Sequence, residues 1–419
     1  MRTARRFFAA AFIALLCFSA AAQSDAAPPK PAPSSPAAPG KHAAPPKPLP
    51  GDAKVRPAIE NGLVWLCRHQ DEDGAWRAQV FGAHCDQGAS CADKEEKTDG
   101  YDPGITALAV LALLGSGTTP TAPIVVHGAK PDVSWDTWAA AQRGIAWLIA
   151  RQEKNGSFGG MQTMYSECLG AIALCDASRI GKNWDWRQAA QRAVDYLEAS
   201  QASNPRGKGL WGWRYVPKDQ QSDTSVTGWV VRAFAAADRA GIRVPKAAIT
   251  GAQDYIVWVT GDWGLVGYMD PEQAGQKVTG HNDDFDYHAG TMTALGIQVR
   301  LRTDEKPDKV NSGWIKTAVE RVLLKDLPSA KTRLGVDYYY WHQAMDAWAL
   351  IAACGMKPVA QSGLAWRTAL VDALTTLQSP ASEKCSSGGW LQQDRWGYAG
   401  GTVYTTAINV LTLEQAAGG

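Results

Sequence analysis

The sequence predicts an all-α fold made of six helical hairpin repeats. Three observations support this prediction: one short residue pattern recurs along the chain, a more apolar helical stretch follows it, and strand signals are almost absent. A length of 419 residues with 45% hydrophobic content is sufficient for a large buried core. The 42 Lys and Arg nearly balance the 41 Asp and Glu and gather in no single stretch, which argues against a nucleic-acid partner.

The N-terminal residues predict export from the cytoplasm. Arg2, Arg5 and Arg6 precede an uncharged run over residues 7–22, and this order is typical of a secretory signal peptide. The run is short and rich in alanine, so we expect cleavage near its end rather than retention as a membrane anchor. The expected location of the mature protein is therefore periplasmic or secreted.

The rest of the chain divides into a linker and a folded domain. After the signal peptide at residues 1–22, residues 23–52 are rich in Pro and Ala, which predicts a disordered tether. Residues 53–419 carry the repeated pattern and form the predicted helical domain. No later stretch is long and apolar enough to span a bilayer, so we expect no transmembrane segment in the mature protein.

The repeated pattern places the first helix of each hairpin. It reads small residue, aromatic residue, aliphatic residue, Gln, and then Gly and an aromatic residue in a tight turn. The recognisable copies are Gly62, Trp65, Leu66, Gln70, Gly74 and Trp76; Gly144, Trp147, Leu148, Gln152, Gly156 and Phe158; Ala193, Tyr196, Leu197, Gln201, Gly209 and Trp211; and Leu374, Gln378, Gly388 and Trp390. Between Gln201 and Gln378, the stretches 252–259 and 316–324 supply two degenerate copies, which makes six.

A second helix follows each turn and is the more apolar of the pair. Ala and Leu occupy nearly all of its faces, whereas the first helices carry charged residues on one side. The second helices are predicted at residues 105–114, 167–177, 226–240, 290–301, 343–354 and 403–413. We therefore expect the second helices to form an inner layer and the first helices an outer layer.

The repeat resembles a known family. The stretch 143–158 is similar to the glutamine-tryptophan repeat of squalene–hopene cyclases, and the chain resembles bacterial exported proteins with prenyltransferase/squalene-oxidase repeats. Residues 222–229 and 401–407 are typical of that group, and the resemblance covers roughly residues 55–415. It implies the (α/α)6 toroid of the terpenoid cyclase and protein prenyltransferase superfamily, with six parallel inner helices and six antiparallel outer helices.

The motifs of the family's enzymes are missing. The Asp-x-Asp-Asp acid of class II terpene cyclases has its nearest counterpart in residues 283–286, where Phe285 interrupts the acidic run in the reverse order. Protein prenyltransferases hold zinc with Asp, Cys and His, but no Cys lies between Cys175 and Cys354. Terpene cyclase activity is thus the least favoured function, and the sequence predicts neither a metal nor a cofactor.

Parallel inner helices would bring their N-terminal segments together at one mouth of the ring, and these segments are acidic and aromatic. The candidate acid–base residues are Asp283, Asp284, Asp286, His288 and His342. The candidate substrate-binding residues are Tyr101, Tyr165, Tyr287, Tyr339, Trp341 and Tyr404. The alternative is structural: polar residues such as Asp223 can cap helices, and aromatic residues can wedge between them.

Cys85 and Cys91 lie in a polar loop at a spacing that allows a disulfide in an oxidising compartment. The neighbouring His84 raises zinc binding as a weaker alternative, because no second pair of ligands is evident in the sequence.

The sequence favours a cell-envelope protein that binds or processes an elongated ligand, a glycan or an isoprenoid-linked molecule, in a central cavity. One alternative is a noncatalytic scaffold for a cell-envelope partner. The other is a polysaccharide lyase or hydrolase in which Asp286, His288 and His342 share the acid–base roles.

Overall fold

A computed structural model describes the chain in several ranges. They are residues 54–79, 81–85, 99–128, 133–159, 164–261, 264–271, 273, 275, 289–303, 312–382 and 384–418. The chain divides into the units Met1–Ala43 and Ala44–Gly419, and every described residue belongs to the second. The predicted boundaries at residues 22 and 52 fall outside these ranges and stay predictions. Within the described ranges, no helix has the length and apolar character needed to cross a membrane.

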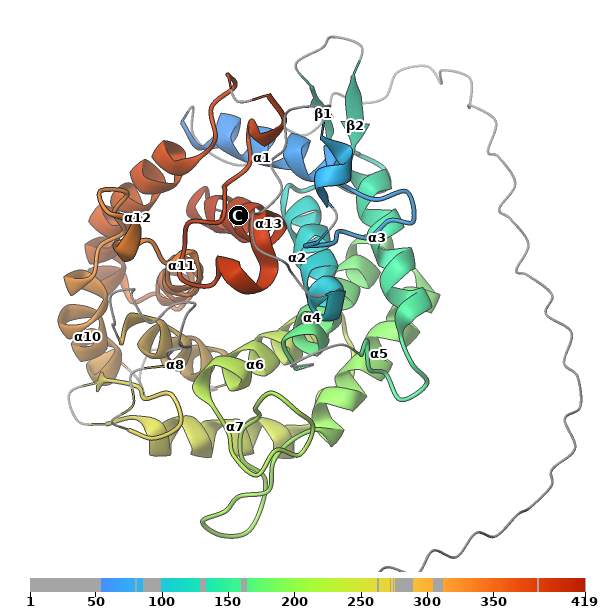
Figure 1. Cartoon of the computed structure of the whole chain (residues 1–419). Helices are drawn as coiled ribbons and strands as arrows, with labels where there is room; N and C mark the ends of the chain where they lie inside the picture. The colour runs from blue at the N-terminus through green and yellow to red at the C-terminus, as the bar shows by residue number, and fades with distance from the viewer. Residues whose placement is uncertain are drawn as a thin grey trace, which may run out of the picture. The chain divides into compact units, whose positions relative to one another are not determined.

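Six helices form the inner layer of a closed ring (Figure 1). Each packs against the next one along the chain, and the last packs against the first. These helices are α2 (Asp102–Gly115), α4 (Met164–Gly181), α6 (Thr224–Arg239), α8 (Gly290–Thr303), α11 (Tyr338–Ala353) and α13 (Gly397–Ala416). All six coincide with the predicted apolar helices. A break in α13 at Gly401, where φ is +64°, turns its first residues away from the helix axis.

The outer layer consists of the helices that precede the turns. They are α1 (Val55–Arg68), α3 (Thr137–Arg151), α5 (Trp184–Ala199), α7 (Lys246–Val259), α10 (Ser312–Arg321) and α12 (Lys357–Leu377). The predicted layers are confirmed by burial, since inner helix α2 buries 13 of its 14 residues and outer helix α5 only five of 16. The strands of the described residues are β1 (Val125–His127) and β2 (Ser134–Asp136), an antiparallel pair before α3.

The glutamine of the repeat joins the first, second, third and last hairpins each to the next one around the ring. Its side-chain amide donates one hydrogen bond to a carbonyl of its own turn and a second to a carbonyl in the following outer helix. The acceptor carbonyls are those of Gly74 and Ala140 for Gln70, Gly156 and Ala189 for Gln152, Trp211 and Ala248 for Gln201, and Gly388 and Ala58 for Gln378. Because Ala58 lies in α1, the last of these glutamines joins the end of the ring to its start.

The glycine of the repeat is required for two reasons. Gly74, Gly156 and Gly388 have φ values of +96°, +98° and +86°, a backbone conformation that side chains disfavour. A Cβ atom at these positions would also lie 2.4, 2.1 and 2.4 Å from a backbone oxygen of the next outer helix. Glycine therefore allows both the turn and the close approach of two neighbouring repeats.

In the third copy of the repeat, Trp213 takes the place expected for Trp211. The indole of Trp213, not that of Trp211, donates to the Leu197 carbonyl at 2.7 Å, as the tryptophans of the first and last copies do in their own helices. Gln201 bonds the carbonyl of Trp211, which thus occupies the place of the turn glycine. Gly209 has φ +99° but nothing lies near its missing side chain, because the longer loop carries it away from the neighbouring helix.

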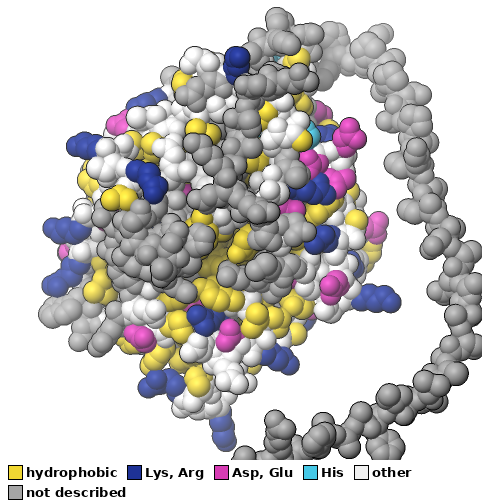
Figure 2. Space-filling view, viewed as in Figure 1, with side chains coloured by type: hydrophobic (Ala, Val, Ile, Leu, Met, Phe, Trp, Pro, Cys, Tyr) yellow, Lys and Arg dark blue, Asp and Glu magenta, His cyan; other side chains and the backbone are white. Residues whose placement is uncertain are grey.

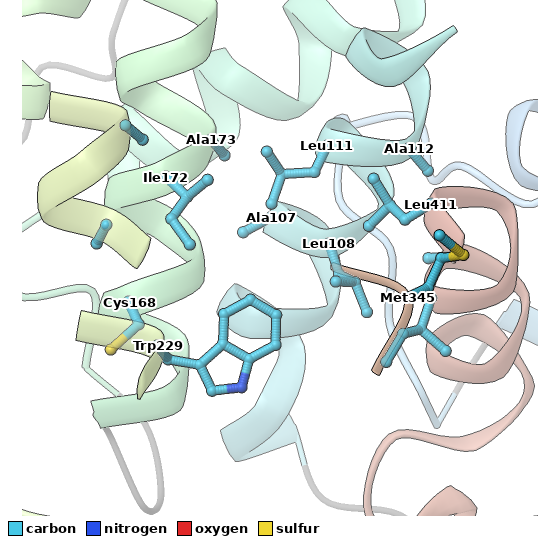
Figure 3. Close-up of a cluster of buried hydrophobic side chains, with 14 of the residues drawn as sticks. Ala107, Leu108, Leu111, Ala112, Cys168, Ile172, Ala173, Trp229, Met345 and Leu411 are labelled. Atoms are coloured by element: carbon cyan, nitrogen blue, oxygen red, sulfur yellow. The ribbon is translucent and has the colours of Figure 1, made fainter. Parts of the chain in front are cut away.

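The middle of the ring is filled by apolar side chains. Leu108 and Leu111 of α2, Ile172 of α4, Met345 of α11 and Leu411 of α13 point toward one another, as Figure 3 shows. All are buried, with at most 9% of their surface exposed. The close packing of these side chains makes the ring a solid core rather than a pore.

Candidate binding site

A cavity of about 240 Å³ lies where the six inner helices begin. It is bounded by residues from the first turns of all six, which shows that the inner helices run parallel. These residues include Ile105 of α2, Ser166 of α4, Ser225 of α6, Thr291 of α8, Tyr339 of α11 and Tyr404 of α13. Figure 2 shows hydrophobic side chains gathered in the hollow at the middle of the ring. Leu108 and Trp229 line the inner end of the cavity, where it meets the apolar core.

A chain of hydrogen bonds fixes the aromatic wall. The Tyr165 hydroxyl donates to Ser225 Oγ at 2.8 Å, and Ser225 Oγ lies 2.6 Å from the Tyr339 hydroxyl. The indole Nε1 of Trp229 donates to the same Tyr339 oxygen at 2.9 Å. These contacts join α4, α6 and α11 and hold the Trp229 and Tyr339 rings nearly parallel, at an angle of 27°. The wall is therefore preorganised before any ligand arrives.

A second tyrosine pair lies beside a buried carboxyl. The hydroxyls of Tyr215 and Tyr268 are 2.5 Å apart, and both residues line the cavity. Asp223 caps α6 by accepting a hydrogen bond from the Val226 amide at 2.8 Å, which confirms the capping role expected for it. Burial raises the pKa of Asp223 to about 7, against the opposing charge of Arg214.

Charged groups occupy the side of the cavity near α11 and α13. Asp337 and Arg395 line the cavity, and Asp337 also caps α11 by accepting from the Tyr340 amide at 2.8 Å. The neighbouring Asp394 is 5% exposed, and its burial, together with the charge of Asp337, raises its pKa to about 8. Asp394 is not among the residues that line the cavity, so its carboxyl lies behind the wall.

The structure places four of the six predicted aromatic residues in the cavity wall: Tyr101, Tyr165, Tyr339 and Tyr404. Trp341 is instead 1% exposed and packs edge-on against Tyr338, with ring centroids 5.6 Å apart, outside the wall. The sixth residue, Tyr287, lies outside the described residues. That these side chains bind a substrate stays a prediction.

The predicted acid–base cluster cannot be placed as a whole. Four of its members, Asp283, Asp284, Asp286 and His288, lie outside the described residues. His342 is buried in α11 and does not line the cavity. Arg232 approaches its Nε2 at 2.7 Å, while Nδ1 lies 3.1 Å from the Thr412 hydroxyl. Burial and the charge of Arg232 lower its pKa to about 3, so the ring is neutral and serves the core.

The predicted Cys85–Cys91 disulfide also stays a prediction, because Cys91 lies outside the described residues. The Cys85 sulfur lies 3.8 Å from Nε2 of His69, a contact that the sequence did not indicate.

Several residues of the cavity wall lie in loops and were not predicted: Tyr215, Tyr268, Arg395 and Trp396. Two of them share a position in the repeat. Tyr215 follows Trp213 by two residues, and Tyr268 follows Val266 by two. The Trp213 and Val266 amides donate to equivalent threonines, Thr227 and Thr293. A sequence alignment that places Trp213 and Val266 at the same position of the repeat would have predicted both tyrosines.

No family model matches the chain, and no curated protein matches it. Several solved structures are similar to it. An α-1,6-mannanase from Salegentibacter sp. HEL1_6, solved as an inactive variant with α-1,6-mannotriose, has a TM-score of 0.56 and 9% identity over 86% of this chain and 98% of that one. A protein from Listeria innocua has a TM-score of 0.54 and 11% identity over 87% of this chain and 97% of that one.

The chain is an α/α toroid. The fold implied by the family resemblance is thereby confirmed. A type II terpene cyclase from Scytonema is more distant, with a TM-score of 0.48 and 15% identity over 87% of this chain and 98% of that one. At these identities the likeness concerns the fold, and the function of the toroid has to be argued from its cavity.

Proposed function

We propose that the toroid binds an oligosaccharide in the cavity at the start of its inner helices. The observation that carries the proposal is the composition of the wall, which combines aromatic rings with hydroxyl groups. Aromatic faces can pack on the C–H surface of a sugar ring, while hydroxyl groups exchange hydrogen bonds with its substituents. The hydrogen bonds that run from Tyr165 to Trp229 hold these groups in place, so that binding does not have to order them.

The charged part of the wall favours a glycan over an isoprenoid chain. Asp337 and Arg395 both line the cavity. A hydrocarbon ligand would displace water from these groups without replacing its hydrogen bonds, which is unfavourable. A sugar offers hydroxyl groups to both. None of the motifs described above supports terpene cyclase activity.

Paired tryptophan variants test the proposal. Trp396 lines the cavity, whereas Trp184 is 67% exposed on outer helix α5. We expect Trp396→Ala to weaken oligosaccharide binding about tenfold, since the loss of one aromatic contact is worth about 1.4 kcal/mol. Trp184→Ala should bind like the wild type. Isothermal titration calorimetry measures both, with α-1,6-mannotriose as the first probe because the mannanase of similar fold was solved with it.

The panel should also contain acidic oligosaccharides and a polyprenyl phosphate in detergent. Binding of the polyprenyl phosphate alone would contradict the proposal, as would equal affinities of the two tryptophan variants. If no probe binds, the scaffold alternative gains support. Matching circular dichroism spectra of the variants confirm that each one is folded.

A second candidate function is cleavage of the bound glycan, and the carboxyl of Asp337 in the cavity wall is the observation that favours it. A carboxyl that reaches a bound sugar can act as a general acid or base. Shorter products after incubation, lost in Asp337→Asn while binding remains, would identify cleavage. Intact oligosaccharide after prolonged incubation would leave binding as the function.

We further propose that this function is performed outside the cytoplasm. The proposal rests on Arg2, Arg5 and Arg6 before the uncharged run 7–22, with the linker 23–52 as a tether to a cell-envelope partner. Mass spectrometry of the protein isolated from a periplasmic or culture fraction should show an N-terminus near residue 23. An intact N-terminus in the cytoplasmic fraction would contradict export.

A further inference from the structure

We propose that His69, Cys85 and Cys385 bind a zinc ion at the junction between the first and last repeats. One ligand atom of each, the His69 Nε2 and the two sulfurs, lies within 4.8 Å of the other two. The three residues come from separate segments: His69 directly follows α1, Cys85 directly follows the 3₁₀ turn at Phe81–His84, and Cys385 lies in the 3₁₀ turn at Lys384–Ser386. This inference is independent of the ligand of the central cavity.

His69 is oriented as a metal-binding histidine. Its Nδ1 lies 2.8 Å from the Trp65 carbonyl and donates to it, which leaves the lone pair of Nε2 directed to the cluster. The Trp65 ring stacks on the imidazole at 4.0 Å, and Phe81 contacts its edge. The ring cannot turn without breaking these contacts, and a backbone carbonyl on the second nitrogen is a typical support of a histidine ligand.

The spacing of the donors suits zinc. Zinc bonds of about 2.0–2.3 Å place tetrahedral ligand atoms about 3.3–3.8 Å apart. The separation of 3.8 Å between Cys85 Sγ and His69 Nε2 lies at the upper end of this range. Two thiolates and one imidazole select zinc over calcium and magnesium, because calcium and magnesium prefer oxygen ligands. The described residues supply three ligands, so water or a further ligand would take the fourth position.

The site has a structural consequence for the ring. His69 and Cys85 belong to the first repeat and Cys385 to the last. Arg68 donates to the Cys385 carbonyl, and Gln378 donates to Ala58, so the same junction is also joined by hydrogen bonds. A zinc ion would add bonds that unfolding must break, and its binding energy would contribute to folding.

Metal analysis of the full-length chain, purified under reducing conditions and incubated with zinc, tests the proposal. We expect one tightly bound zinc per chain, and cobalt in its place should give sulfur-to-metal charge-transfer absorption. Cys385→Ser, a nearly isosteric change, should weaken zinc binding at least about tenfold. Cys354→Ser is the matched control, because Cys354 lies outside the cluster, and it should retain the metal.

Three results would overturn the proposal. They are the absence of zinc binding in the reduced wild type, unchanged affinity in Cys385→Ser, and cobalt spectra without a sulfur contribution. If Cys385→Ser fails to fold, the cobalt spectrum of the wild type still decides whether thiolates bind the metal. Peptide mapping of the oxidised protein reports the competing outcome, a disulfide that occupies Cys85 or Cys385 and prevents metal binding.

Discussion

At the residue scale, His342 shows that a histidine near a row of acidic and aromatic residues can be a core residue. Arg232 donates to its Nε2, Nδ1–H donates to the Thr412 hydroxyl, and that hydroxyl donates to the Ile408 carbonyl. The ring also stacks on Trp229 at 13°. Every polar atom of the ring is satisfied, so His342 positions the cavity wall from behind and cannot exchange a proton with a ligand there.

This burial predicts a dependence of stability on pH. The pKa of His342 is lowered to about 3 in the folded chain, so the unfolded chain binds an extra proton at any pH between about 3 and 6.5. The contribution of His342 to the free energy of unfolding should therefore fall as the pH is lowered from about 7 to 4, whereas the raised pKa values of Asp223 and Asp394 act in the opposite direction. The pKa of His69 is lowered by burial, as that of His342 is.

Urea unfolding at several pH values measures this dependence. The difference in the free energy of unfolding between the wild type and His342→Gln, which retains a donor and an acceptor, should shrink as the pH falls from about 7 to 4. His127→Gln, a change at an exposed position of β1, should reproduce the wild-type profile. A difference for His342→Gln that does not change with pH would show that His342 does not carry the effect.

At the element scale, the turns of the first, second and last hairpins are fixed to both layers. The glycine of each turn lies against the next outer helix, and the amide of its aromatic residue donates to an inner-helix side chain, as from Trp76 to Thr106 and from Trp390 to Thr406. In the second repeat Glu167 replaces the threonine and accepts from the Phe158 amide. The orientation of the inner helices therefore depends on a few turn residues.

Two glycine substitutions separate backbone strain from close packing. Gly388 and Gly209 both have positive φ, but only at Gly388 would a Cβ atom collide with a neighbouring backbone, at Asn61. Gly209→Ala should lower the free energy of unfolding by about 1–2 kcal/mol, the cost of the left-handed conformation. Gly388→Ala should cost at least about 1 kcal/mol more, because the overlap forces a shift of the backbone. Equal losses in denaturant unfolding would contradict the packing role.

At the scale of the whole toroid, the ring is closed by the same contact that joins its other repeats. Gln378 donates to Gly388 and to Ala58 of α1, just as Gln152 donates to its own turn and to α5. Inner helices α13 and α2 are packed together as well. The junction is thus equivalent to an internal boundary.

The closure of the ring leads to a prediction for Gln378 and Gln152. Gln378→Ala and Gln152→Ala each remove two hydrogen bonds to carbonyls, and each should lower the free energy of unfolding by about 1–3 kcal/mol. Similar losses in parallel denaturant titrations are expected. A loss at Gln152 with none at Gln378 would indicate a ring that opens at the junction in solution.

The fold could be predicted because the repeat is local. In four of the six hairpins a glutamine is followed by a tight turn with an aromatic residue, and these copies are enough to reveal the period of the ring. The cavity wall was predicted in part, since Tyr101, Tyr165, Tyr339 and Tyr404 lie where inner helices begin. The raised pKa of Asp394 could not be predicted, because it arises from burial and from the charge of Asp337, a residue far away in the sequence.

The apolar side chains that fill the ring also limit how a polymer can enter. Leu111, Ile172, Met345 and Leu411 meet across the axis beneath the cavity. A long chain therefore cannot thread from one face to the other, and a tip that enters must stop against Leu108 and Trp229. An elongated ligand would thus reach the cavity with one of its ends rather than pass through the ring.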